Sequence, residues 1–267
     1  MATRLTLCAD DLGQSCAINE AIADLAARRR LNAATLMVDG VEAAAGVAAL
    51  AGSEIALGLH VTLCEALTPL RSALAPSGRL PHIDSLTARA FTGRLPVAAI
   101  AAEIERQYDR FEDLVGRAPA FVDAHQHAHI LPGIRRLYLA AAARRAPNAW
   151  VRTCEEDIAT IWRRGAFRWI AARSALLSRG LAAQAGRLGL RTNRGFAGLY
   201  DWDSHPDLER LFGRWLLAPG AAPLIICHPA RLDRADRSGG ARAREYAFLR
   251  DGPVEQMVAA AGLRLSN

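Results

Sequence analysis

The 267-residue chain contains no lysine, so all 33 of its basic residues are arginines. Aromatic residues make up only 6% of the sequence, and few of them lie between the arginines. A net charge of +6 that is spread along the chain in this way does not favour a nucleic-acid surface. We therefore expect no nucleic-acid partner.

Disulfide and membrane signals are also scarce. The five cysteines are odd in number and show no CxxC spacing, a pattern typical of free thiols in a reducing compartment. No basic leader with an apolar signal region precedes the first strand-like segment, and no apolar stretch approaches the roughly 20 residues of a membrane-spanning helix. We expect a soluble, cytoplasmic protein.

Hydrophobic residues, at 51% of the sequence, are numerous enough for one large domain over residues 1–267. Apolar runs rich in Leu, Ile and Val alternate with longer segments of helical period, which indicates β-α units around a parallel sheet. The expected strands are Arg4–Ala9, Ala33–Val38, Ile55–Val61, Ala120–Ala124, Ala149–Arg152, Leu224–Cys227 and Leu263–Leu265. This pattern predicts an α/β fold, a TIM-like (β/α) barrel whose ring of strands can be incomplete.

The helical segments are longer than the strands and less regular. The expected helices are Ser15–Arg30, Val97–Val115, Gly133–Arg145, Trp162–Leu188 with breaks, Pro206–Leu217 and Pro253–Ala261. In the helix from Val97, apolar residues recur at the spacing of a core-facing stripe. Two long connections, Cys64–Leu95 and Arg191–Ser204, show no strong period, and loops of such length are usually functional or disordered.

Acidic and imidazole side chains stand where the expected strands end. Asp10 and Asp11 close the run LTLCADDLG, His60 closes IALGLHVTL, and His228 follows the run PLIIC. The run DAHQHAH follows another strand and adds three more histidines. Because the C-terminal strand ends form the active face of parallel α/β folds, we expect these groups to share one crevice. A catalytic metal site takes three protein ligands and keeps a position for water, so we first predict a metal-dependent hydrolase.

The run DAHQHAH places acid and imidazole groups at every second position. If the strand continues through the run, Asp123, His125, His127 and His129 lie on one face of the sheet. Three such histidines are hard to explain by packing. The alternative is a polar histidine face that shields a loop.

The other groups have structural explanations as well. Asp10 and Asp11 could cap the helix expected from Ser15, since aspartate is a favoured capping residue. His60 and His228, each taken alone, could be interior histidines with satisfied hydrogen bonds. A metal site is favoured only because all four groups, the acid pair, His60, the DAHQHAH run and His228, occur at strand ends together.

Four motifs in order, LCADDLG, GLHVTL, DAHQHAHILP and ICHPA, resemble those of the YdjC-like carbohydrate deacetylases. This family includes chitooligosaccharide deacetylases and hopanoid-biosynthesis-associated deacetylases. The resemblance covers nearly the whole chain and implies a distorted (β/α) barrel that removes acetyl groups from N-acetylated sugars with a divalent metal. The sequence departs from the family at Leu12, Gln126 and Ala230, none of which is an implied ligand.

The resemblance also implies a role for individual residues. It assigns the metal to Asp11, His60 and His125, the general base to Asp10, and the acid that protonates the leaving amine to His228. It further implies that Arg152 holds the base carboxylate ionised. His127 and His129 are expected to orient the ligands from behind. Imidazole favours zinc, whereas magnesium prefers oxygen ligands, and both Zn²⁺ and Mg²⁺ remain candidates.

Aromatic side chains suggest where the substrate binds. Phe196, Tyr200 and Trp202 offer flat faces to a sugar ring, although they could equally anchor a long loop to the barrel. The segment Trp162–Arg173 interleaves aromatic and apolar residues with arginines. It could be a basic amphipathic helix that lies on a membrane surface, which would suit a lipid-linked sugar, or an outer barrel helix with solvated arginines. A homodimer is left open.

Three competing functions can be compared with the sequence. A metal-dependent phosphoesterase-type barrel would use a similar set of ligands. An amidohydrolase barrel that bridges two metals with a modified lysine is excluded by the absence of lysine. A non-catalytic carbohydrate-binding barrel would need neither the base Asp10 nor the acid His228.

Overall fold

The computed structural model describes residues 2–65, 74–75, 77–233 and 240–265. Eight strands form one curved sheet in the order β7-β6-β5-β4-β3-β2-β9-β8, and neighbouring strands run parallel. These strands are β2 (Thr6–Leu12), β3 (Ala33–Leu36), β4 (Ala56–Val61), β5 (Phe121–Ala124), β6 (Trp150–Val151), β7 (Arg191–Thr192), β8 (Phe196–Ala197) and β9 (Leu224–Cys227). Two short strands, β1 (Thr3–Arg4) and β10 (Leu263–Arg264), pair with each other.

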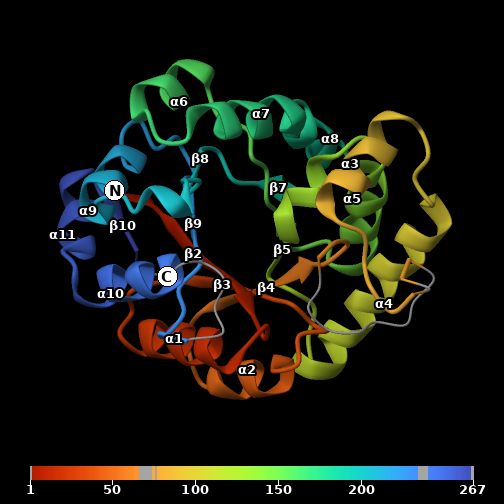
Figure 1. Ribbon diagram of the computed structural model, residues 1–267, viewed down its shortest axis with the longest axis horizontal. Helices are drawn as coiled ribbons and strands as arrows, with labels where there is room; N and C mark the ends of the chain where they lie inside the picture. The colour runs from red at the N-terminus through yellow and green to blue at the C-terminus, as the bar shows by residue number, and fades with distance from the viewer. Residues whose placement is uncertain (1, 66–73, 76, 234–239, 266–267) are drawn as a thin grey trace.

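Helices surround the curved sheet as an outer ring (Figure 1). They are α1 (Cys16–Ala27), α2 (Ala43–Ala49), α3 (Ile83–Phe91), α4 (Val97–Val115), α5 (Ile134–Arg145), α6 (Ile158–Arg164), α7 (Arg168–Ser178), α8 (Leu181–Arg187), α9 (Leu208–Trp215), α10 (Ala241–Asp251) and α11 (Val254–Ala260). Strands β3 and β9 are buried at every position, as expected for a parallel sheet that helices cover. No helix within the described ranges is both long and apolar enough to cross a membrane.

The ring of strands is incomplete. Strands β7 and β8 are the two edges of the sheet, and within the described residues no ladder joins them. Figure 1 shows both edges on the side of the molecule where α6, α7 and α8 lie. The α/β fold predicted from the sequence, a distorted and incomplete barrel, is confirmed.

Several predicted elements agree closely with the structure. Strand β9 and helix α4 have the expected bounds, and the apolar stripe of α4 is buried at Ile100, Ile104 and Tyr108. The segment Trp162–Leu188 is divided into three helices because Gly165 and Gly180 adopt left-handed backbone with φ of 69° and 82°.

The two predicted connections contain more structure than expected. Arg191–Ser204 includes β7, β8 and the 3₁₀ helix η2 (Trp202–Ser204), and Cys64–Leu95 includes α3. Each of these strands has two residues, too few for a period to be visible. Residues 66–73 and 76 of the first connection lie outside the described part of the chain.

One buried asparagine joins the ends of the chain to the barrel. The Asn32 side chain accepts a hydrogen bond from the Leu7 amide (3.0 Å) and donates to the carbonyls of Leu5 (2.8 Å) and Leu265 (2.7 Å). It thereby links β2, the segment before β3 and the residue that follows β10.

We predict that Asn32→Ala lowers the free energy of unfolding by about 2–4 kcal/mol, because it removes the partner of the Leu7 amide in β2 and of the Leu5 carbonyl just before this strand. Urea denaturation measures this change. Asn148→Ala, at an exposed position, is the control and should change stability by less than about 0.5 kcal/mol. Equal stability of the two variants would show that the Asn32 hydrogen bonds contribute little.

Candidate metal centre and active site

A β-bulge brings two neighbouring carboxylates to one side of strand β2. In the pairing with β3, Ala9 lies opposite Ala34 and Leu12 opposite Leu36, so two residues, Asp10 and Asp11, face one residue of β3. Asp11 has a φ of 71°, in the left-handed region that few aspartates adopt. Without the bulge, adjacent side chains of a strand would point to opposite faces.

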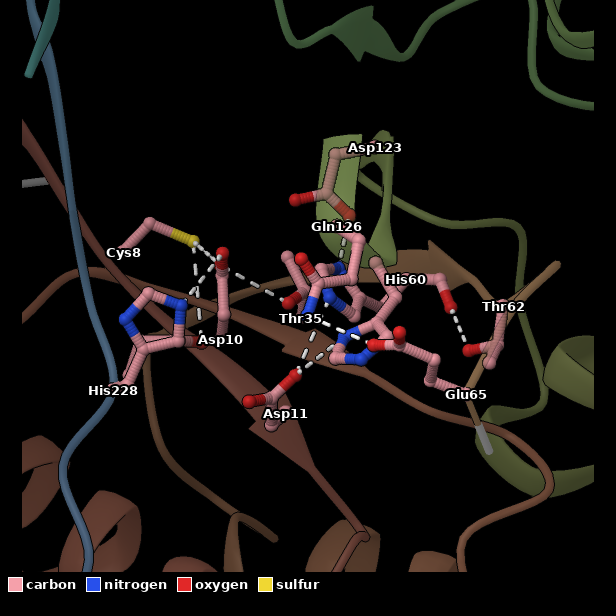
Figure 2. Close-up of polar contacts among 12 residues, drawn as sticks. Cys8, Asp10, Asp11, Thr35, His60, Thr62, Glu65, Asp123, Gln126 and His228 are labelled. Carbon is pink, nitrogen blue, oxygen red and sulfur yellow. Dashed lines mark hydrogen bonds and ion pairs between the residues drawn. The ribbon is translucent and has the colours of Figure 1, made fainter. Parts of the chain in front are cut away.

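Asp11, His60 and His125 converge at the C-terminal ends of β2, β4 and β5. The Asp11 Oδ1 atom lies 3.1 Å from His125 Nδ1 and 3.4 Å from His60 Nε2. One potential ligand atom from each residue lies within 4.8 Å of the other two. Figure 2 shows Asp11 and His60 close to each other in the site. One carboxylate and two imidazoles match the three-ligand set of a catalytic metal site, so the residues fit a divalent cation.

Asp123 orients His60 from behind. Its Oδ1 atom lies 2.6 Å from His60 Nδ1, and the two residues are direct partners in the β4–β5 ladder. Burial alone would lower the pKa of His60, but Asp123 and Asp11 raise it to about 10. The imidazole therefore carries positive charge between carboxylates, and a metal would replace its Nε2 proton.

Arg152 binds two buried carboxylates at once. Its guanidinium is completely buried and donates to Asp10 at 2.6 and 2.7 Å, with Asp123 Oδ2 at 2.7 Å. Burial raises the pKa of Asp10. The charge and hydrogen bonds of Arg152 lower this pKa by more than burial raises it, so the net pKa is well below the usual value. The contact that the sequence predicts between Arg152 and Asp10 is present.

A second group of potential ligands, Asp10, His60 and Asp123, also lies close together. Both of its carboxylates are paired with Arg152, and Asp123 already occupies His60 Nδ1. A cation there would meet the guanidinium charge directly. The position between Asp11, His60 and His125 is therefore the better metal site.

Arg242 is a site residue that the sequence did not reveal. Its Nη2 atom lies 2.5 Å from Asp11 Oδ2, on the carboxylate oxygen that faces away from His125, and its guanidinium lies 5.2 Å from the centre of the Trp202 ring. Burial raises the pKa of Asp11, while Arg242 and His125 lower it to a net value well below normal. One arginine among the three of α10 carries no local signal, so only the fold could identify it.

His228 follows β9 and lies beside Asp10. Its Nε2 atom is 3.9 Å from Asp10 Oδ2, and its ring is 5.3 Å from that of Trp202. Burial lowers the pKa of His228 to about 4, against the opposing effect of Asp11 and Asp10. The ring is therefore neutral near pH 7 before a substrate binds.

The histidine run does not continue the strand, so the condition under which its alternate residues would share one face is not met. Strand β5 ends at Ala124, which pairs with Val61, the last residue of β4. In the described structure, β4 therefore has no residue left to pair with the histidines that follow Ala124. The 3₁₀ helix η1 (His125–Ile130) follows, and Gln126 and His127 have φ of 52° and 54°. The turn separates the three histidines instead of aligning them on one face.

His127 and His129 consequently have different surroundings from His125. His127 lines the cleft, whereas His129 is completely buried with its ring 5.1 Å from that of Tyr138. Within the described ranges, neither ring hydrogen-bonds Asp11, His60 or His125. Burial lowers the pKa of His127 to about 3. Asp123 makes the contact that the sequence led us to expect from these two histidines.

A cleft with a volume of about 690 Å³ opens above these groups. Its floor contains both acids of β2 together with His60, His125 and His228, and Tyr200 and Trp202 form part of its wall. Residues of α3 and α7 complete the wall with apolar side chains that include Phe91, Ile170 and Leu177. Phe196, the third predicted sugar-binding aromatic, lies outside this lining, with its ring 5.5 Å from that of His127.

A buried glutamate supports the backbone of His228. The Glu245 carboxylate accepts a hydrogen bond from the His228 amide at 2.5 Å. Burial raises the pKa of Glu245 to about 7, and the hydrogen bonds from His228 and Tyr200 offset part of this effect. Between pH 4.5 and 7 the folded chain thus keeps a proton that the unfolded chain releases, so stability falls as pH rises.

We predict that Glu245→Gln removes this pH dependence. Relative to the unchanged protein, the variant should gain up to about 3 kcal/mol in the free energy of unfolding as pH rises from 4.5 to 7. Urea denaturation at a series of pH values measures the difference, with Glu209→Gln, at an exposed position, as the control. A difference that stays constant with pH would mean that Glu245 titrates normally.

The chain resembles known proteins over most of its length. A model of the family described as YdjC-like protein matches residues 4–260. The chain is 30% identical over 263 residues to a chitooligosaccharide deacetylase of Klebsiella pneumoniae (strain 342), covering 95% of this chain and 90% of the relative. It is 28% identical to a carbohydrate deacetylase of Mus musculus, over 79% of this chain and 70% of the relative.

A solved structure shares the fold. It comes from Enterococcus faecalis V583, its description assigns it cellobiose-phosphate cleavage only provisionally, and it superimposes with a TM-score of 0.77. The two chains are 21% identical, with 100% of this chain and 98% of the other covered.

Proposed function

We propose, given that the chain belongs to the family described as YdjC-like protein, that it is a metal-dependent hydrolase acting on N-acetylated sugars. In this proposal residues 1–267 act as one catalytic domain. The observation that carries the proposal is the convergence of Asp11, His60 and His125 beside a second carboxylate, Asp10, which Arg152 holds ionised. The names of the curated relatives, carbohydrate and chitooligosaccharide deacetylase, support the same reaction class.

Asp11, His60 and His125 would hold a divalent metal, with Zn²⁺ favoured over Mg²⁺ because two of the three ligands are imidazoles. When bound, the metal supplies a Lewis acid that polarises the acetyl carbonyl and a water molecule. The hydrogen bond from His60 to Asp123 fixes the orientation of the ligand ring.

Asp10 is the proposed general base. It accepts a proton from the water whose oxygen attacks the acetyl carbonyl carbon. The C–N bond then breaks, and the products are acetate and a free amino sugar. Arg152 and the Thr35 hydroxyl, 3.1 Å from Asp10 Oδ1, hold the carboxylate in place.

His228 is the proposed acid for the leaving nitrogen. Because its pKa of about 4 leaves the free ring neutral, the proton that it donates must come from the reaction itself. His228 Nε2 lies 3.9 Å from Asp10 Oδ2, which is longer than a hydrogen bond, so the two side chains must move closer before the proton taken from water passes from the base to His228. The proton then reaches the nitrogen as the C–N bond breaks.

The cleft suits an amphiphilic substrate. Tyr200 and Trp202 offer ring faces for a sugar, and apolar residues of α3 and α7 extend the wall away from the polar floor. We propose as substrate either an N-acetylated oligosaccharide or a glycolipid such as an N-acetylglucosaminyl hopanoid. The expected cytoplasmic location and a homodimer stay predictions.

The alternatives are less consistent with the site. A non-catalytic carbohydrate-binding barrel would not need a base held ionised in the interior or a histidine beside it. A phosphoesterase would use the same cation but release phosphate. Assaying acetate and phosphate release from acetylated and phosphorylated sugars distinguishes the three functions.

Replacement of the base should abolish most of the activity. We predict that Asp10→Asn lowers the rate of acetate release by about 10²- to 10⁴-fold, because the amide cannot accept the proton. Metal content, measured by elemental analysis, should remain near normal. Asp113→Asn on the exposed surface of α4 is the control and should retain activity. Full turnover by Asp10→Asn would exclude this residue as the base.

Removal of one imidazole ligand should instead abolish metal binding. We predict that His125→Gln lowers the bound metal far below one ion per chain and stops acetate release, as should treatment with a chelator. His82→Gln replaces an exposed histidine and should bind metal normally. Calorimetric titration with Zn²⁺ measures both variants, and normal affinity in His125→Gln would remove that residue from the ligand set.

A further inference from the structure

An apolar surface remains uncovered on helices α6 and α7. The Trp169 side chain is 74% exposed and that of Leu176 65%, and Trp162 and Phe167 are also exposed. The rings of Trp162 and Trp169 lie 5.1 Å apart, edge to face, so the two helices present one aromatic pair to solvent. Figure 1 shows α6 and α7 side by side on the outer ring.

Beyond Asp157, which caps the start of α6, the same region has charge of one sign. No acidic residue occurs between Ile158 and Tyr200. The basic residues in this stretch are Arg163, Arg164, Arg168, Arg173, Arg179, Arg187, Arg191 and Arg194. Arg164 is buried and paired with Glu156, but Arg163 and Arg168 are exposed and have no carboxylate partner among the described residues. The surface is therefore both apolar and strongly basic.

Helix α7 connects this surface to the active-site cleft. On its inner side this helix lines the cleft with Ile170, Ser174 and Leu177. Trp169 directly precedes Ile170, and Leu176 directly precedes Leu177, so both exposed side chains point about 100° away from the cleft around the helix axis. The helix also contacts η1, which contains His125. Whatever covers the outer face of α7 thus lies beside the mouth of the cleft.

We propose that this docking face, formed by Trp162, Arg163, Arg168, Trp169 and Leu176, rests on an anionic membrane surface. Tryptophan favours the boundary between headgroups and acyl chains, where its ring is buried and its N–H stays hydrated. Arginines next to it are attracted to anionic headgroups. The contact goes beyond the proposed reaction and does not depend on it.

A second copy of the chain is a poorer occupant of this face. A two-fold symmetric contact brings the same surface of both copies together, so the unpaired arginines would oppose one another. A membrane supplies many negative charges and accepts the tryptophans at the same time.

Vesicle sedimentation with the full chain tests the proposal without any substrate. The protein should sediment with phosphatidylcholine vesicles that contain phosphatidylglycerol at low salt and be released at high salt. The double variant Arg163→Gln with Arg168→Gln should bind about 30-fold more weakly, at roughly fivefold per arginine. Trp162→Ser with Trp169→Ser should lose sedimentation with these vesicles.

Matched controls replace exposed residues elsewhere. Arg110→Gln with Arg117→Gln, and Val41→Ser with Leu217→Ser, should bind vesicles as the unchanged protein does. None of the substituted residues lines the cleft, so each variant should release acetate from a soluble substrate at the unchanged rate. Loss of vesicle binding can therefore be told apart from failure of the proposed reaction. Circular dichroism verifies that each variant is folded.

Three results would overturn the proposal. One is absence of binding to anionic vesicles at low salt. Another is equal binding by the docking-face variants and the controls. The third is self-association in sedimentation equilibrium that the docking-face variants abolish, because this would make the face a dimer contact.

Discussion

The candidate active site depends on one buried guanidinium. Arg152 neutralises Asp10 and Asp123 in the interior of the barrel, where unpaired carboxylates would be protonated or would destabilise the fold. Losing one partner of such a buried pair typically costs about 3–5 kcal/mol. Arg152 keeps Asp10 ionised, as the proposed base must be, and through Asp123 it also holds the ring of His60 in place. Asp11 and the two imidazoles are left for a cation.

Strand geometry explains how these groups meet. Parallel strands present their C-terminal ends at one edge of the sheet, so residues far apart in the sequence lie together there. The bulge in β2 adds the second carboxylate, since it turns both Asp10 and Asp11 to the site. The end of β5 at Ala124 then lets His125 turn toward Asp11.

The sequence predicted much of the site because strand ends are visible as apolar runs that stop at polar residues. This placed both acids of β2, His60, His125 and His228 in one crevice, whereas their individual roles came from the resemblance to the YdjC-like family. Contacts that depend on tertiary structure were missed. The pairing of His60 with Asp123 follows from the register of β4 and β5, and that of Arg242 with Asp11 from the position of α10. The two-residue strands β7 and β8 show no period, and the turn after Ala124 was hidden by the alternating histidines.

Anomalous diffraction from crystals soaked in Zn²⁺ would locate the cation directly. We predict a single strong peak at about 2.0–2.2 Å from Asp11, His60 Nε2 and His125 Nδ1. A peak bound by Asp10 and Asp123, or no peak in this cleft, would contradict the assignment of Asp10 as a base beside a metal.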